Sequence, residues 1–268
     1  MFLKSKDADF FITAMGQGKR TFVAHGGWVG SGELWLPPFE HLSQRWRTVT
    51  YDHRGTGATV NRASPITFEL LVDDLFRILD EMKIDRCVLA GESSGALVVL
   101  EAALRQPDRF EGLVLVGGRA SSSNTAGAAR FIDGCKVDFD ATMDAFVEAC
   151  IPEQDADAEK RWSKQIVKRS NGTEAVQLME AMWTARVEDR LEQIAQPTLL
   201  IHGRHDRITP VAMSEEMATR IPRSKLVVLE DAGHVPVITR AADVAREIEG
   251  FFERYCSLEQ ENPPFGER

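Results

Sequence analysis

Residues 91–95 read Gly-Glu-Ser-Ser-Gly, and they stand between two apolar runs, residues 86–90 and 96–104. The first run has the length of a buried strand, and the second has the length of a helix start. A junction between them needs a tight, strained turn, and glycines permit it because a Cβ atom would collide there. The pattern predicts a strand, a sharp turn and a helix, with Ser93 exposed at the tip.

Further apolar runs, each bounded by turn residues, continue this pattern on both sides. The set comprises residues 21–24, 47–51, 86–90, 113–116, 197–201 and 225–229. Each run predicts a buried strand, and Phe68, Leu71, Leu75 and Leu79 have the spacing of an amphipathic helix between two of them. This alternation predicts an α/β fold, a mostly parallel twisted sheet with helices on both faces. Residues 10–14 are expected to add an antiparallel edge strand.

The alternation stops after Gly117 and resumes near Pro197. The intervening residues show helical spacing of apolar side chains and no convincing strand, so we expect an all-helical cap inserted into the core. The expected division is core residues 1–118, cap residues 119–190, core residues 191–256 and a flexible tail, residues 257–268.

A serine hydroxyl is a good nucleophile only when an imidazole takes its proton and a carboxylate orients that imidazole. Ser93 is preferred to Ser94 because it holds the central position of the turn. Among six histidines, His234 follows the predicted strand at residues 225–229, and small residues precede it in its loop. His234 is therefore the expected base.

The carboxylate is expected between Ser93 and His234 in chain order. Asp206, in the loop after the predicted strand at residues 197–201, meets this condition and is the expected acid. Asp231 is a rival, but it lies only three residues before His234 in the same loop. Support from the loop of a neighbouring strand is the better geometry for orienting the ring.

His202, His205 and Asp206 also have a spacing that could attract a metal ion. No second cluster of histidines or cysteines completes a set of three or four ligands. The sequence therefore predicts neither a metal site nor a cofactor.

Backbone N–H groups must stabilise the negative charge that develops on the carbonyl oxygen. The helix after the nucleophile directs its first N–H groups at this position, so the N–H of Ser94 is one expected donor. Residues 25–28 read His-Gly-Gly-Trp, and the glycines allow the backbone to approach a bound substrate closely. The N–H of Gly27 or Trp28 is the second expected donor.

These motifs resemble those of the α/β-hydrolase family, over about residues 20–250. Residues 25–28 resemble its HGxx oxyanion motif, residues 51–58 its DxRGxGxS loop, and residues 91–95 its nucleophile elbow. The surroundings of Asp206 and His234 are similar to its acid motif and its histidine loop. The resemblance implies a helical cap over the site, and a serine nucleophile argues against dehalogenase or epoxide-hydrolase chemistry, which uses aspartate.

The chain departs from the common family pattern at three positions. Glu92 and Ser94 flank the nucleophile where many relatives have other residues, and Ala58 ends the DxRGxGxS loop in place of serine. A glutamate before the nucleophile resembles the plant hydroxynitrile lyases. None of these departures removes a catalytic group, but they leave the subfamily open.

The net charge and the apolar stretches of the chain limit the kinds of partner that we expect it to bind. The chain has 32 Lys and Arg against 41 Asp and Glu, a net charge of −9, so no basic surface is expected to hold nucleic acid. No apolar stretch reaches the about 20 residues of a membrane span, and the N-terminus lacks the apolar segment of a signal peptide. We expect a cytoplasmic protein with reduced cysteines and a small-molecule substrate. A homodimer is compatible with the sequence.

The sequence thus predicts a serine hydrolase that cleaves a small to medium, largely apolar carboxylic ester through an acyl-enzyme. Four apolar cap residues are expected to line its pocket: Phe146, Met179, Met182 and Trp183. The same triad could instead open a lactone, hydrolyse a C–C bond or cleave a cyanohydrin. A third hypothesis is a ligand-binding receptor with little turnover, which the complete triad disfavours.

Overall fold

One twisted sheet organises the computed structural model, which describes residues 1–121 and 126–261. The strands are β1 (Phe2–Lys4), β2 (Ala8–Met15), β3 (Thr21–His25), β4 (Arg47–Tyr51), β5 (Val60–Asn61), β6 (Cys87–Glu92), β7 (Phe110–Val116), β8 (Thr198–Gly203) and β9 (Ser224–Leu229). Their order is β1-β2-β4-β3-β6-β7-β8-β9, and β5 pairs with β2. The pairs from β4 to β9 along this order are parallel, whereas β2 is antiparallel to its neighbours. The predicted parallel sheet with an antiparallel N-terminal edge is confirmed.

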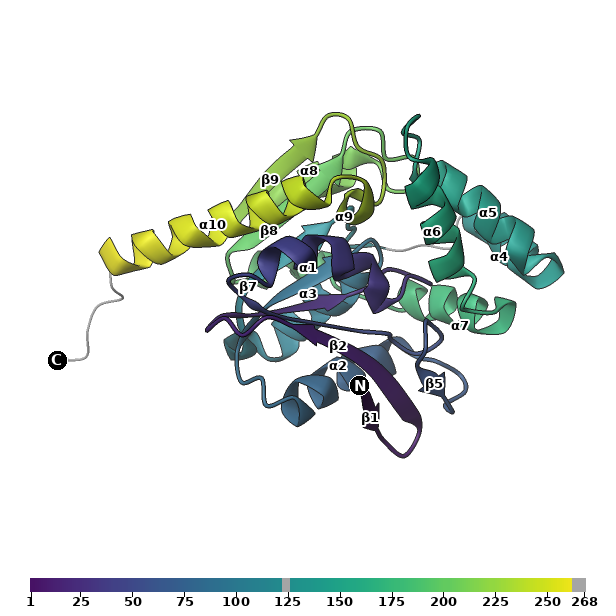
Figure 1. Ribbon diagram of the computed structural model, residues 1–268, viewed down its shortest axis with the longest axis horizontal. Helices are drawn as coiled ribbons and strands as arrows, with labels where there is room; N and C mark the ends of the chain where they lie inside the picture. The colour runs from purple at the N-terminus through teal and green to yellow at the C-terminus, as the bar shows by residue number, and fades with distance from the viewer. Residues whose placement is uncertain (122–125, 262–268) are drawn as a thin grey trace.

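Helices cover both faces of this sheet (Figure 1). The helices that pack on the sheet are α1 (Leu36–Leu42), α2 (Phe68–Glu81), α3 (Gly95–Arg105), α8 (Val211–Arg220), α9 (Pro236–Thr239) and α10 (Ala241–Glu261). The short 3₁₀ helices are η1 (Gly32–Trp35), η2 (Pro107–Arg109) and η3 (Glu188–Gln193). One hydrophobic cluster contains the buried faces of α2 and α3, and a second contains those of α1 and α10. The α/β architecture predicted from the sequence is therefore confirmed.

Local sequence explains the two elements that position the site. All six residues of β6 are buried, as in a strand with a neighbour on each side and helices above and below. The predicted amphipathic helix is α2, which begins where the Thr67 side chain accepts a hydrogen bond from the N–H of Leu70. Its apolar stripe then lies against the sheet.

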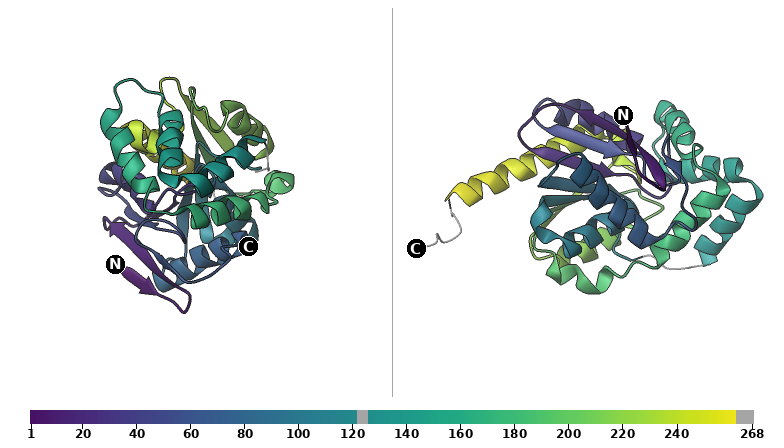
Figure 2. Two further views of the ribbon diagram at one scale, coloured as in Figure 1. Left: turned by 90° about the vertical axis from the view of Figure 1, so that its right-hand side faces the viewer. Right: turned by 90° about the horizontal axis from the view of Figure 1, so that it is seen from below.

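Four helices occupy the segment between β7 and β8: α4 (Ala126–Val137), α5 (Phe139–Cys150), α6 (Asp157–Val167) and α7 (Gly172–Trp183). We call them the inserted helices. They gather at one end of the sheet, beside the carboxyl ends of the parallel strands (Figures 1 and 2). The Trp28 indole N–H, in the loop after β3, donates to the carbonyl oxygen of Ala175 at 2.8 Å and so joins α7 to the core.

The C-terminal helix differs from expectation. Helix α10 includes residues 257–261, which the sequence suggested as irregular tail, and residues 262–268 lie outside the described part. The first turns of α10 bury Val244, Ile248, Phe251 and Phe252 against the sheet, and the helix then projects away from it (Figure 1).

Cys87, Cys135 and Cys150 are buried free thiols. Within residues 1–121 and 126–261, no helix combines the length and the apolar character that a bilayer span requires.

Candidate active site

The turn between β6 and α3 holds Ser93 in a strained backbone conformation. Its φ angle is +52°, in the left-handed region that residues with a Cβ atom rarely adopt. A Cβ atom on Gly91 would lie 2.7 Å from the backbone of Gly95, and one on Gly95 would lie 2.5 Å from the carbonyl oxygen of Gly26. These contacts explain the glycines at both ends of the turn, which leaves Ser93 at the carboxyl end of β6.

Ser93, His234 and Asp206 form one hydrogen-bonded chain. His234 Nε2 lies 2.9 Å from Ser93 Oγ, and His234 Nδ1 lies 2.7 Å from Asp206 Oδ2. The three residues follow β6, β9 and β8, whose parallel carboxyl ends bring their loops together. When Nδ1 donates to Asp206, Nε2 can accept the proton of Ser93 Oγ. The structure thus brings together the three residues that the sequence singled out.

The Asp206 carboxylate is fully buried and well supplied with donors. Its Oδ1 accepts from the N–H groups of Ile208 and Thr209, both at 2.8 Å. Burial alone would raise the pKa of Asp206, but the charge of His234 and hydrogen bonds from His202, His234 and Thr209 hold it well below its ordinary value. Asp206 is therefore ionised at neutral pH and able to orient the imidazole.

His202 supports the Asp206 carboxylate. Its Nε2 lies 2.7 Å from the carbonyl oxygen of Thr209 and 3.1 Å from Asp206 Oδ2, which are both acceptors, so this nitrogen carries a hydrogen. Its Nδ1 then accepts from the Ser214 hydroxyl at 2.7 Å. The sequence signal for this role is the place of His202 in β8, four residues before Asp206.

Asp231, the rival carboxylate, lies at the surface. Its side chain is 77% exposed, and it forms an ion pair of 2.9 Å with Arg240. The geometry therefore favours Asp206 as the partner of His234.

The loop that carries His234 is fixed by the inserted helices. The N–H of His234 donates to the carbonyl oxygen of Cys150, the last residue of α5, at 2.8 Å. The N–H of Gly233 and the hydroxyl of Thr239 both donate to Glu153 Oε1 at 2.9 Å. Glu153 follows α5, and sequence reasoning did not identify it, because no local pattern reveals a contact over 80 residues.

Backbone N–H groups near Ser93 are suited to stabilising an oxyanion. In the described part of the chain, the N–H groups of Trp28 and Ser94 do not donate to backbone carbonyls, whereas the N–H of Gly27 hydrogen-bonds to the Glu92 carboxyl. His53 Nε2 lies 2.9 Å from the Gly27 carbonyl oxygen. Because that peptide is planar and trans, the N–H of Trp28 points away from His53. Ser94 is the N-cap of α3, so its N–H lies at the positive end of a helix dipole.

Glu92 is an unusual neighbour for this site. Its side chain lies between Gly27, on which a Cβ atom would collide with Oε2, and His234, whose Nε2 is 3.8 Å from Oε1. Burial raises the pKa of Glu92 to about 7, although the positive charge of His234 opposes this effect. A carboxyl that titrates near neutrality therefore lies beside the Ser93–His234 pair.

A small cavity of about 40 Å³ adjoins Ser93, and its surface is predominantly apolar. Its walls come from the loop after β3, the elbow and the His234 loop, and from five residues of α5 and α6: Phe146, Val147, Cys150, Ser163 and Val167. The inserted helices therefore cover the nucleophile. A substrate of more than a few atoms requires this space to widen.

Of the four residues expected in the pocket, only Phe146 lines this cavity. Met179, Met182 and Trp183 pack with the larger hydrophobic cluster. Their helix, α7, contacts α2 and α4. The helical spacing of apolar residues identified the apolar face of α7, but it did not specify which part of the molecule that face contacts.

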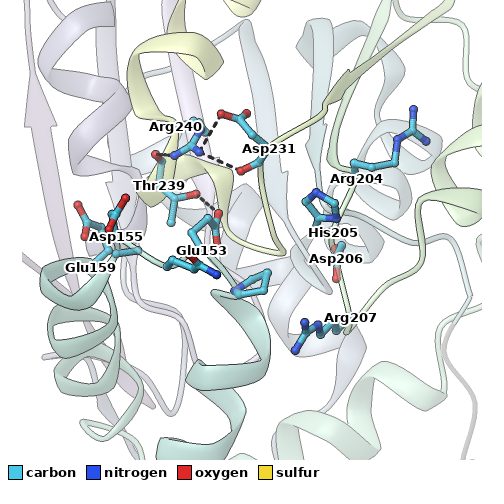
Figure 3. Close-up of a pocket in the computed structure, with 13 residues that line it drawn as sticks. Glu153, Asp155, Glu159, Arg204, His205, Asp206, Arg207, Asp231, Thr239 and Arg240 are labelled. Atoms are coloured by element: carbon cyan, nitrogen blue, oxygen red, sulfur yellow. Dashed lines mark hydrogen bonds and ion pairs between the residues drawn. The ribbon is translucent and has the colours of Figure 1, made fainter.

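A larger cavity, of about 660 Å³, is lined in part by the Asp206 loop, and Figure 3 shows the residues around it. Its walls are charged, and two of its arginines already have partners, Arg240 with Asp231 and Arg204 with Glu230. Asp206 is the one triad residue in its wall, and the Asp206 side chain is fully buried. This cavity therefore does not give a substrate access to the nucleophile.

The loop after β4 has a structural role. Asp52 accepts hydrogen bonds from the N–H groups of Gly32 and Ala58, at 3.0 and 2.7 Å. Arg54 is fully buried and makes a two-point ion pair with Asp74, at 2.6 and 3.0 Å. Counted from Asp52, the eighth position of the DxRGxGxS pattern is Thr59, so the assignment of Ala58 to the serine position is wrong by one residue. The Thr59 hydroxyl donates to the Asp52 carbonyl oxygen at 2.6 Å, and Ala58 contributes through its backbone N–H.

The elbow, the hydrogen-bonded chain and the parallel sheet define a hydrolase fold. The sequence pattern of the alpha/beta hydrolase family matches residues 22–247, and the chain belongs to this family. The match spans all three residues of the Ser93–His234–Asp206 chain as well as the inserted helices. The family resemblance seen in the sequence is confirmed.

Two relatives and two solved structures illustrate the similarity. A protein of Agrobacterium fabrum, provisionally named carbamate hydrolase, is 27% identical over 229 residues, covering 82% of this chain and 87% of its own. The pimeloyl-(acyl-carrier protein) methyl ester esterase of Nitrosomonas europaea is 27% identical over 249 residues, covering 87% and 95%. An esterase from Exiguobacterium antarcticum superposes with a TM-score of 0.87 at 20% identity, covering 94% and 98%. The enol-lactonase from Burkholderia xenovorans gives 0.88 at 22%, covering 94% and 100%.

Proposed function

We propose that this protein is an esterase-like serine hydrolase that cleaves a small to medium, largely apolar carboxylic ester. The observation that carries the proposal is the hydrogen-bonded chain from Ser93 Oγ through His234 to Asp206, at 2.9 and 2.7 Å. Membership of the alpha/beta hydrolase family supports hydrolytic chemistry. The name of the Nitrosomonas europaea relative supports an ester as the substrate.

Acylation begins when Ser93 Oγ attacks the ester carbonyl carbon while His234 Nε2 takes the hydroxyl proton. Asp206, ionised and hydrogen-bonded to Nδ1, stabilises the imidazolium that forms. The C–O bond to the alcohol then breaks, and His234 returns the proton to the leaving oxygen. Water, activated by the same imidazole, releases the acid and regenerates Ser93.

The oxyanion of each tetrahedral intermediate is stabilised by the N–H of Ser94 and by the N–H of Trp28 or Gly27. The lack of backbone carbonyl partners for Ser94 and Trp28 among the described residues supports this role, and it favours Trp28 over Gly27, whose N–H hydrogen-bonds to Glu92. Removing one such donor typically slows an enzyme by about 10²- to 10³-fold.

The inserted helices act as a cap that shapes the acyl site. The small volume and apolar walls of the cavity beside Ser93 support a short acyl group packed against Phe146. Longer substrates would require α5 or α6 to move.

A fluorophosphonate probe tests the nucleophile directly. We expect intact-mass analysis to show one adduct on the wild-type protein and none on Ser93→Ala. Ser94→Ala is the matched control, because it removes a neighbouring hydroxyl but keeps the backbone N–H, and we expect it to be labelled. A folded wild-type protein that stays unlabelled would overturn the proposal and favour a receptor.

A substrate panel tests the bond that is cleaved. It comprises 4-nitrophenyl esters of increasing chain length, a carbamate, a lactone and a cyanohydrin. We expect turnover of the short esters. The carbamate is included because of the name of the Agrobacterium fabrum relative. Turnover of the lactone or cyanohydrin without turnover of any ester would contradict ester hydrolysis while leaving the nucleophile in place.

A further inference from the structure

Two buried polar groups in the cavity beside Ser93 have no hydrogen-bond partner. They are Oε1 of Glu92 and the hydroxyl of Ser163, in residues that are 2% and 5% exposed. The remaining cavity surface is predominantly apolar. Burying a polar group without a partner is costly, so most such groups in folded proteins are paired.

The neighbours of Glu92 satisfy only part of its carboxyl, because the backbone N–H of Gly27 hydrogen-bonds to it but Oε1 has no partner. His234 Nε2, at 3.8 Å from Oε1, is beyond hydrogen-bond distance and is engaged with Ser93 Oγ at 2.9 Å. In the described part of the chain, no other side chain donates to Oε1. The carboxyl therefore lies in the wall of the substrate cavity with unused capacity to accept a hydrogen bond.

We infer that Glu92 is a specificity-determining residue, which binds an O–H or N–H donor on the atom next to the scissile carbonyl of the substrate. The inference rests on the proposed function, because the attack of Ser93 on the substrate carbonyl fixes the position of the substrate relative to Glu92. Glu92 directly precedes Ser93, so a group one bond from the carbonyl carbon enters the cavity that the carboxyl lines. The substrate class is the esters of short 2-hydroxy acids and their N–H counterparts.

Desolvation makes this contact selective. A substrate that brings a donor gives Oε1 of Glu92 the partner that it lacks, whereas an apolar analogue of the same shape leaves Oε1 unpaired. When Glu92 is ionised, a hydrogen bond to its charged carboxylate is of the stronger kind and is worth at least about tenfold in a binding or rate ratio.

Three 4-nitrophenyl esters test the inference. The glycolate ester carries the hydroxyl donor, and the propionate ester replaces that hydroxyl with a methyl group of similar size. The methoxyacetate ester keeps the electron-withdrawing oxygen but has no donor, so it controls for intrinsic reactivity. We expect kcat/KM of the wild-type enzyme to be about tenfold or more higher for the glycolate ester than for the methoxyacetate ester. This ratio is first divided by the ratio of the rate constants with which hydroxide ion hydrolyses the same two esters.

Two substitutions assign that preference to the carboxyl. In Glu92→Leu the corrected ratio is expected to fall to about 1, whereas Glu92→Gln, whose amide oxygen still accepts, is expected to keep part of it. The ratio is taken within each variant, so a general change in activity cancels. If Glu92 acts only through its charge on His234, both variants change all three esters alike and the wild-type ratio persists, which overturns the inference.

The remaining outcomes separate the two proposals. If the wild-type enzyme hydrolyses all three esters with the reactivity order of hydroxide ion, the inference fails and the proposed function stands. If it hydrolyses none of them and a fluorophosphonate leaves it unlabelled, the proposed function fails. If thermal denaturation shows that Glu92→Leu is unfolded, the inference is judged from the corrected glycolate-to-methoxyacetate ratios of the wild type and of Glu92→Gln.

Discussion

The N–H of His234 donates a hydrogen bond of 2.8 Å to the carbonyl oxygen of Cys150, and this bond anchors the imidazole to the end of α5. A second contact, from the N–H of Gly233 to Glu153, runs between the same two segments. The base of the site is therefore positioned by the inserted helices as well as by β9. Any movement of the end of α5 is expected to move His234.

Replacing Glu153 with Ala removes the acceptor for Gly233 and Thr239, and we expect kcat to fall by about 10- to 100-fold because the imidazole loses its register. KM should change little, since Glu153 does not line the cavity beside Ser93. Glu153→Gln keeps an acceptor oxygen and should recover most of the rate. Steady-state kinetics of both variants, with Asp155→Asn as an exposed control from the same segment, check this. Equal rates for Glu153→Ala and wild type would refute it.

The assignment of the acid is tested by two Asp-to-Asn substitutions. Asp206→Asn is expected to lower kcat by about 10³- to 10⁴-fold, because the imidazole loses the carboxylate that fixes its tautomer. Asp231→Asn breaks only a surface pair with Arg240 and should leave kcat near the wild-type value. The reverse order of the two rates would make Asp231 the acid.

The pH dependence of kcat/KM is expected to report His234. Burial opposes the shift, but the charges of Asp206 and Glu92 raise the pKa of His234 above its ordinary value, and Arg119 acts slightly against them. Activity requires the neutral imidazole, so it is lost as the pH falls through this raised pKa. Glu92→Gln removes one of the two negative charges and should move the acid limb to lower pH. Profiles between about pH 5 and 9 measure the midpoint, and an unchanged midpoint would contradict this expectation.

The buried ion pair beside the loop after β4 is expected to be important for stability. Asp74→Asn removes the carboxylate that makes the two-point pair with the fully buried guanidinium of Arg54, which keeps its ion pair of 3.2 Å with Asp7. We expect the free energy of unfolding to fall by about 1–3 kcal/mol. Urea denaturation measures this loss, with Asp9→Asn, which breaks an exposed pair with Arg62, as the control. A similar midpoint for the two variants would show that Arg54 finds another partner.

Local patterns predicted much of the fold. The buried run of β6, the glycine-flanked turn and the start of α3 are signalled by adjacent residues, so their geometry follows from short-range sterics. The placement of Asp206 and His234 after late strands could also be predicted, because parallel strands bring their carboxyl ends to one edge.

Contacts between distant segments could not be predicted in this way. Helical spacing indicated that Met182 is buried and that Met179 and Trp183 pack against the core, yet it did not reveal that none of the three lines the cavity beside Ser93. The support of the His234 loop by Glu153 depends on how α5 ends against β9, which no local pattern encodes. Burial of the Glu92 carboxyl likewise follows from packing around it.

Two of the buried thiols lie in different layers of the molecule. Cys150 lines the cavity beside Ser93, whereas Cys87 begins the central strand β6. Burial raises the pKa of Cys87 to about 12, and burial together with Glu92 and Asp206 raises that of Cys150 well above its ordinary value, so neither reacts while enclosed. A thiol reagent would reach Cys150 when α5 lifts from the elbow, and Cys87 only when the sheet itself opens. The modification rates of Cys150 and Cys87, measured separately by peptide mass, would therefore report the rate of local opening at α5 and the rate of global opening of the sheet in the same molecule.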